Sequence, residues 1–108
     1  PELLELVRCH QGIAIPAHVE ASPFGLLVNL GLVPGELRQA VLEISCAARA
    51  ESLLKTYPAL VNHPLISNSD AHFLKDIGRA CSVLRMAAPT LAEIRLALRG
   101  DQGRGVVV

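Results

Sequence analysis

Aromatic side chains are scarce in this sequence of 108 residues, which contains no tryptophan, one tyrosine and two phenylalanines. Hydrophobic residues nevertheless make up 51% of the chain, so its core must be built mainly from aliphatic side chains. A chain of this length is long enough to bury one such core. The sequence therefore predicts a single domain over residues 1–108.

The sequence also lacks an excess of charge of either sign and lacks long apolar runs. Ten basic residues balance ten acidic residues, which removes the electrostatic basis for avid nucleic-acid binding by this segment alone. No window approaches the roughly 18 apolar residues of a membrane span, and the first residues do not follow the order of a signal peptide. We expect no membrane partner and a cytoplasmic location, and a nucleic-acid partner is not implied.

Cysteine is the third scarce residue, since Cys9, Cys46 and Cys81 are few and far apart. Without a C-x-x-C pair, they support neither a disulfide framework nor a zinc site built from thiolates. We expect all three to pack as small hydrophobic residues.

Apolar periodicity and turn signals divide the chain into alternating helices and strands. The expected helices cover residues 2–10, the stretch from Ser22 to Leu30, residues 47–60 with a break at Tyr57-Pro58, and the segment from the N-cap Thr90 to Gly100. The expected strands cover residues 13–17, 40–45, 64–67, 80–86 and 106–108. This order, with short connections, predicts an α/β fold with mostly parallel strands.

Four potential metal ligands follow these strands. His18 follows the first strand, Glu43 lies near the end of the second, and Asp70 and His72 follow the third. In a D-x-H triplet on extended backbone both side chains point to one face, and carboxylate and imidazole donors suit zinc, manganese or iron. Because the carboxyl ends of parallel strands share one rim, we expect these residues to meet there.

Two motifs at these strand ends carry a resemblance to a known family. Residues 15–20 (IPAHVE) and 66–72 (ISNSDAH), followed by Asp76-Ile77-Gly78, resemble the last two metal-binding motifs of the PHP (polymerase and histidinol phosphatase) superfamily. The resemblance implies that His18 is a metal ligand and that Asp70 and His72 form the closing catalytic pair. It also implies a distorted (β/α)7 TIM-like barrel, two or three divalent ions (Mn, Fe or Zn) and hydrolysis of a phosphoester.

The resemblance covers only the C-terminal part of a PHP domain, because nothing here matches the family's opening H-x-H strand or its upstream Glu and His. The expected partners are therefore the upstream half of the same domain and a small phosphorylated substrate. Since half a barrel exposes sheet edges and apolar faces, we also expect an oligomer or a large exposed apolar patch.

Three other polar residues, Glu43, Lys75 and Arg79, each have more than one interpretation. Glu43 either supports the ligands, binds metal itself, or pairs with an arginine. Lys75 and Arg79 either hold a substrate phosphate or belong to a solvated turn. His10 and His63 are expected on the surface, away from the rim.

Two functions of different classes follow from these residues. The first is a metal-dependent phosphoesterase to which this chain supplies the last two metal-binding motifs, the isolated chain being nearly inactive. The alternative is a non-catalytic regulatory or interaction module derived from the same fold. A third interpretation is a plain structural α/β domain with solvated His and Asp side chains. Metal content separates the first two functions, because the enzyme should contain stoichiometric metal and the module should not.

Overall fold

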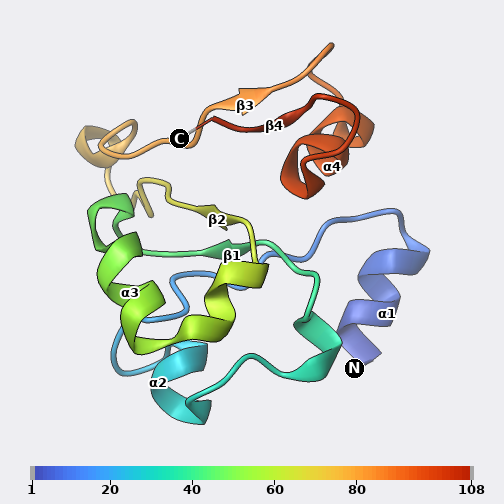
Figure 1. Cartoon of the computed structure of the whole chain (residues 1–108). Coiled ribbons are helices and arrows are strands. Elements are labelled where there is room, and N and C mark those ends of the chain that lie inside the picture. Colours follow the sequence, from blue (N-terminus) through green and yellow to red (C-terminus); the bar gives the residue numbers. More distant parts are fainter. Residues whose placement is uncertain (1, 108) are drawn as a thin grey trace.

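The computed structural model describes residues 2–107 and contains short helices around two small sheets (Figure 1). The helices are α1 (Glu2–Cys9), α2 (Leu26–Leu30), α3 (Ala50–Thr56) and α4 (Leu91–Arg99). The strands are β1 (Leu42–Glu43), β2 (Leu65–Ile66), β3 (Leu84–Arg85) and β4 (Gly105–Val106). Single turns of 3₁₀ helix cover Gly35–Leu37, Ala47–Arg49, Pro58–Asn62 and Leu74–Asp76.

The first sheet pairs β1 with β2 in parallel, with Leu42 opposite Leu65. On the other side of β1 runs the extended segment 13–17, which the sequence predicts as a strand. Its only bond to β1 is donated by the Glu43 amide to the Pro16 carbonyl, 3.0 Å away, and the Val19 amide donates to the Glu43 carbonyl over 2.9 Å. Because proline has no N–H to donate, these contacts do not extend into a ladder.

The second sheet pairs β3 with β4 in antiparallel fashion, with Leu84 opposite Val106. After α4 the chain reverses at once: Gly100 has a left-handed backbone (φ 71°), and the Arg104 amide donates to the Asp101 carbonyl at 2.9 Å. This tight turn brings β4 back beside β3. The expected edge strand at 106–108 is thus found one residue earlier, and Val108 lies outside the described residues.

The prediction of mostly parallel strands forming part of a (β/α)7 barrel is wrong. A barrel requires one continuous ladder of tilted strands, whereas the described strands form two separate pairs, one of them antiparallel. Apolar runs indicate which segments are extended but not how they pair. The segments around Ser67 and Ser82 illustrate this. The Ser82 hydroxyl accepts from the Ser67 amide and donates to the Ser67 carbonyl, in place of a backbone ladder.

Two aliphatic clusters hold the elements together. The larger lies between the first sheet, α2 and α3, and its fully or nearly fully buried members are Val19, Leu27, Leu42, Ile44 and Leu60. The smaller lies between the first sheet and α4 and consists of Val41, Ile66 and Leu98. No buried member of either cluster is aromatic, as the composition predicts, and the half-buried Tyr57 packs against the larger one.

Most helix predictions are confirmed. Helix α1 covers the predicted segment, α3 ends at Tyr57-Pro58, and Gly31 ends α2 with a left-handed backbone (φ 68°). Helix α2 begins at Leu26 rather than at Pro23, because a tight turn built on Gly25 precedes it. A Cβ on Gly25 would lie 2.5 Å from the carbonyl oxygens of Val19 and Ala21, so only glycine fits there.

Helix α4 begins with the predicted N-cap, Thr90, but the Glu93 side chain does not accept from the Thr90 amide as it would in a capping box. The Thr90 hydroxyl accepts from the Glu93 amide at 3.2 Å. The Glu93 carboxylate instead binds Arg104, which donates to both of its oxygens at 2.9 and 3.0 Å. The Ala87 amide also donates to this carboxylate, at 2.8 Å. These bonds fasten the turn before β4 onto α4.

The Arg104 guanidinium and the Ala87 amide both lower the pKa of the Glu93 carboxyl. Because the folded pKa lies below the unfolded one, the pair stabilises the fold at a pH above the ordinary glutamate value of about 4.3. We expect this contribution to disappear as the pH falls through the lowered pKa. Urea unfolding between pH 7 and pH 2 measures it, and E93Q should differ from the native chain most at pH 7 and least at pH 2.

Several expectations about exposure need correction. Cys9, Cys46 and Cys81 are exposed rather than packed, because each falls at a helix end or in a loop outside the two clusters. His10 is exposed as expected, but His63 is buried, with Nδ1 2.9 Å from the Ala40 carbonyl oxygen.

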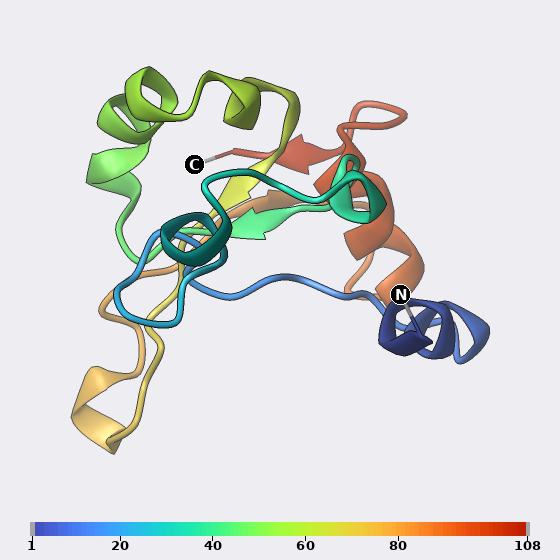
Figure 2. The same ribbon diagram turned by 90° about the horizontal axis from the view of Figure 1, so that it is seen from below.

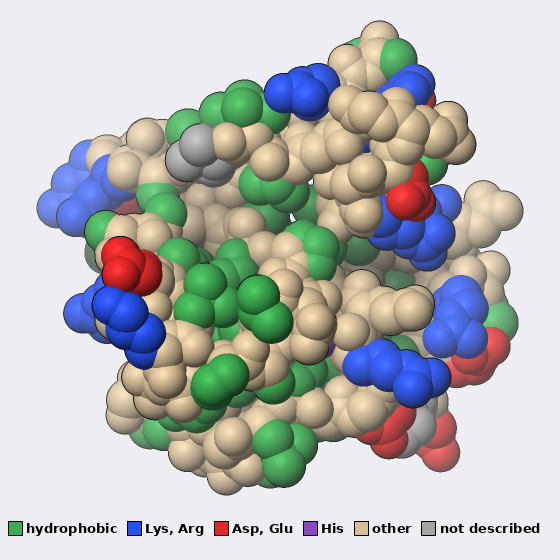
Figure 3. All heavy atoms as spheres, in the orientation of Figure 1, with side chains coloured by type: hydrophobic (Ala, Val, Ile, Leu, Met, Phe, Trp, Pro, Cys, Tyr) green, Lys and Arg blue, Asp and Glu red, His purple; other side chains and the backbone are tan. Residues whose placement is uncertain are grey.

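Many large hydrophobic side chains are exposed, among them Phe24, Phe73, Leu74 and Ile77. In Figure 3 hydrophobic side chains gather in the middle of one face, and charged side chains lie around its edge. Apolar side chains are therefore exposed, although the half-barrel from which a large apolar patch was expected is not formed by the described strands. Within residues 2–107 no helix has the length and apolar character needed to cross a membrane.

Candidate functional site

The structure brings two of the predicted ligands, His18 and Asp70, close together. His18 Nε2 lies 4.0 Å from Asp70 Oδ2, and the two side chains are 39% and 61% exposed. This distance is too long for a direct hydrogen bond. A tetrahedral ion bound to both atoms would hold them about 3.4 Å apart, so a small side-chain rotation would let one ion contact both.

Both residues have an unusual backbone conformation. His18 has φ 29° and Asp70 has φ 45°, and only four non-glycine residues among those described have a positive φ. Such conformations cost free energy of order 1–3 kcal/mol and persist where the surrounding structure enforces them. The chain therefore holds both side chains at this point against a local backbone preference.

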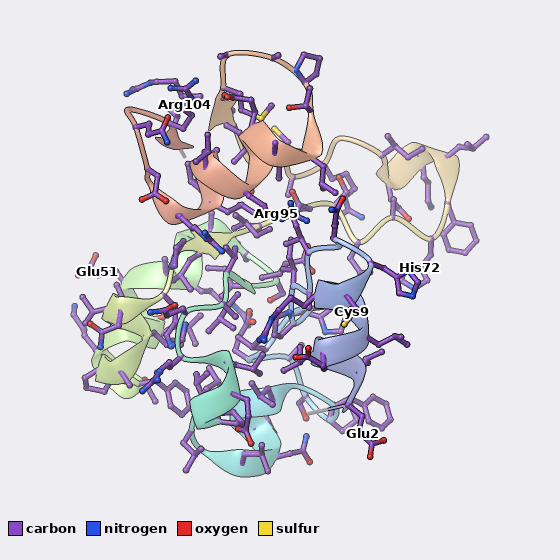
Figure 4. The ribbon with its side chains drawn as sticks, turned by 90° about the vertical axis from the view of Figure 1, so that its right-hand side faces the viewer. Glu2, Cys9, Glu51, His72, Arg95 and Arg104 are labelled. Carbon is purple, nitrogen blue, oxygen red and sulfur yellow. The ribbon has the colours of Figure 1, made fainter. Side chains whose placement is uncertain are left out.

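His72 forms a hydrogen bond with the backbone of Asp70 but is not grouped with the His18 side chain. Its Nδ1 lies 2.8 Å from the Asp70 carbonyl oxygen, and because a carbonyl only accepts, the neutral ring carries its proton on Nδ1 and its lone pair on Nε2. In Figure 4 the His72 ring lies at the outer edge of the molecule. Across residues 2–107 no three His, Cys, Asp or Glu side chains are grouped closely enough to hold a metal ion.

Glu43 lies at the end of β1 and is held by an amide rather than by an arginine. Asn68 Nδ2 donates to Glu43 Oε1 at 3.0 Å, and no ion pair of Glu43 with an arginine occurs among the described residues. Asn68 directly precedes the Ser69-Asp70 step. Glu43 is thus linked through Asn68 to the segment that carries Asp70.

Glu20, two residues after His18, has contacts that the sequence reasoning missed. Its Oε1 accepts from the Ser45 amide at 2.8 Å and also from the Ser45 hydroxyl. Its Oε2 is buried and has no hydrogen-bond partner among the described residues. Its position two residues after His18, within the quoted IPAHVE motif, was the signal available in the sequence.

Segment 70–79 projects from the body of the protein (gold in Figure 2). Its base is closed by Ser69, whose hydroxyl donates to the Ala80 carbonyl at 2.8 Å and accepts from the Gly78 amide at 2.9 Å. Arg79 pairs with Asp76 at 3.2 Å, and Lys75 Nζ lies 5.8 Å from the centre of the Phe73 ring. Both cations predicted for phosphate binding thus lie on this exposed segment with partners of their own.

Two cavities lie away from His18, Asp70 and His72. One, of about 580 Å³, lies between the first sheet and α4, and the other, of about 540 Å³, lies between α1 and α4. Arg95 lines the second (Figure 4) and donates to the Gly12 carbonyl and to the Gln11 carbonyl. The candidate ligands therefore lie on an open surface rather than in either cavity.

Comparison with known proteins gives two matches. A family model described as PHP-associated matches residues 48–102. The uncharacterized protein YqxK of Bacillus subtilis (strain 168) is 30% identical in an alignment over 104 residues. The alignment covers 89% of this chain and 26% of YqxK. The chain thus spans about a quarter of the length of this relative. No solved structure gives a significant match.

Proposed function

Because this chain belongs to the PHP-associated family, we propose that it supplies metal ligands to a metal-dependent phosphoesterase completed by residues outside this chain. His18 and Asp70 are the two primary donors for one ion, and His72, which lies apart from them, is proposed as a donor to a further ion of the completed site. The substrate class is a small phosphorylated molecule. The partner is an upstream half of the same catalytic domain.

The approach of His18 Nε2 to Asp70 Oδ2, at 4.0 Å, is the observation that carries this proposal. The two residues are far apart in sequence, and both have left-handed backbones. Imidazole nitrogen and carboxylate oxygen form a donor set that suits Zn²⁺, Mn²⁺ or iron. The chemistry of the residues present therefore fits a divalent ion.

A bound divalent ion supplies an activated water at neutral pH and offsets charge on the phosphoryl oxygens. The residues of this chain position the donors. The Nδ1 bond of His72 to the Asp70 carbonyl fixes its tautomer, and Asn68 fixes Glu43 near the same segment. Such outer contacts orient ligands and raise metal affinity.

The non-catalytic module remains the second candidate, and the number of donors favours it. Within residues 2–107 no group of three potential ligands exists, whereas a hydrolytic site with two or three ions needs more donors than this chain brings together. The module reading predicts a full-length protein without stoichiometric metal.

The deciding experiment uses the full-length protein that carries these residues, purified with and without added Mn²⁺. We expect stoichiometric metal and hydrolysis of p-nitrophenyl phosphate that EDTA abolishes and Mn²⁺ restores. The 108-residue chain alone should bind Mn²⁺ weakly and have almost no turnover, because it holds too few donors. A full-length protein with neither bound metal nor turnover would contradict the enzyme and support the module.

A further inference from the structure

We propose that Glu20 is a positioning residue, which holds His18 beside Asp70 by binding Ser45. This inference rests on the proposed function, because it assigns a role within the same site. Glu20 is not proposed as a metal ligand, since no group of three potential ligands forms in the described part of the chain.

The contacts of Glu20 join two segments that are distant in sequence. Its Oε1 accepts both the amide proton and the hydroxyl proton of Ser45, and Ser45 follows β1 by two residues. A carboxylate that accepts two hydrogen bonds is held more firmly than a neutral acceptor. The carboxylate therefore ties the turn that begins at His18 to the carboxyl end of the first sheet.

The backbone between His18 and Glu20 transmits this restraint. Val19 is completely buried, and its amide donates to the Glu43 carbonyl at 2.9 Å while its carbonyl accepts from the Leu27 amide at 2.8 Å. With Val19 fixed in the core and Glu20 fixed on Ser45, little freedom is left for His18. This explains how its positive φ is maintained.

The second oxygen of Glu20 argues against a role in stability alone. Glu20 Oε2 is buried without a partner among the described residues, and an unsatisfied buried oxygen costs free energy. The Glu20 side chain therefore holds Ser45 at a local cost in stability, and the position of His18 gives a reason for that contact.

The test compares the native chain with E20A, E20Q and S45A by NMR, with E51A as a matched control. Glu51 is an exposed glutamate on α3 that pairs with Lys55. The first readout is the nuclear Overhauser effect between the His18 ring and the Asp70 β protons, measured without metal. The second is Mn²⁺ affinity, from paramagnetic broadening of the His18 ring signals, and urea unfolding measures stability separately.

We expect E20A to lose the His18–Asp70 signal and to bind Mn²⁺ about tenfold more weakly, as changes around metal ligands typically do. E20Q should retain the signal, because its carbonyl oxygen still accepts from Ser45, and E51A should match the native chain. If E20A does not fold, S45A gives a milder form of the comparison, with a weaker His18–Asp70 signal than the native chain, since it removes the hydroxyl donor of Ser45 and leaves the amide donor.

An E20A or S45A chain that is less stable but keeps the native signal and the native Mn²⁺ affinity would overturn the inference, because Glu20 would then be merely structural. Failure of the proposed function would look different. In that case the native chain would not bind Mn²⁺, while the metal-free signal would still decide the role of Glu20.

Discussion

Asp70→Asn should lower the metal-dependent turnover of the full-length protein at least about 100-fold. The amount of metal bound per protein should fall by a similar factor. The substitution keeps the size of the side chain but removes the anionic oxygen that faces His18. Asparagine adopts a left-handed backbone as readily as aspartate, so φ 45° is retained. With 61% of the side chain exposed, we expect the free energy of unfolding to change by less than about 0.5 kcal/mol.

The matched control is His10→Ala. His10 is exposed and lies at the end of α1, away from Asp70, so turnover and metal content should match those of the native protein. His63 is unsuitable as a control, because it is buried against the Ala40 carbonyl. A D70N protein with native turnover and native metal content would remove Asp70 from the site.

Leu42→Ala should lower the free energy of unfolding by about 2–5 kcal/mol, the range measured for a leucine removed from a packed core. Leu42 is completely inaccessible to solvent and lies in β1 at the centre of the larger cluster. Because small domains are stable by only about 5–15 kcal/mol, this change should remove a large fraction of the total stability. Urea denaturation followed by circular dichroism measures it.

Leu74→Ala provides the comparison for this prediction. Leu74 is 89% exposed on the projecting segment, so its truncation should change stability by no more than about 0.5 kcal/mol. Equal losses for L42A and L74A would mean that the cluster around β1 is not the core of the folded chain.

The sequence predicts local structure well where a side chain acts on its own neighbours. Thr90 begins α4, Gly31 and Gly100 end α2 and α4, and the Tyr57-Pro58 step ends α3. The pairing of strands depends instead on contacts between distant segments. Pro16 interrupts a ladder, and the turn at Gly100 sends β4 back antiparallel to β3, which no apolar pattern encodes.

The same distinction applies to the site. The positions of His18 and Asp70 after extended segments were enough to predict that they approach each other, and they lie 4.0 Å apart. The D-x-H spacing also predicted that His72 shares their face, but the left-handed backbone at Asp70 breaks the alternation of an extended strand and leaves His72 apart. Glu20 was missed because its partner, Ser45, is adjacent only in the folded chain.

The central claim is that His18 and Asp70 bind one metal ion. Crystals of the full-length protein grown with Mn²⁺ test it most directly, through the anomalous scattering of manganese. The account predicts a peak within about 2.0–2.3 Å of both His18 Nε2 and Asp70 Oδ2. Manganese bound at other residues, with neither of these atoms in its coordination sphere, would contradict the claim.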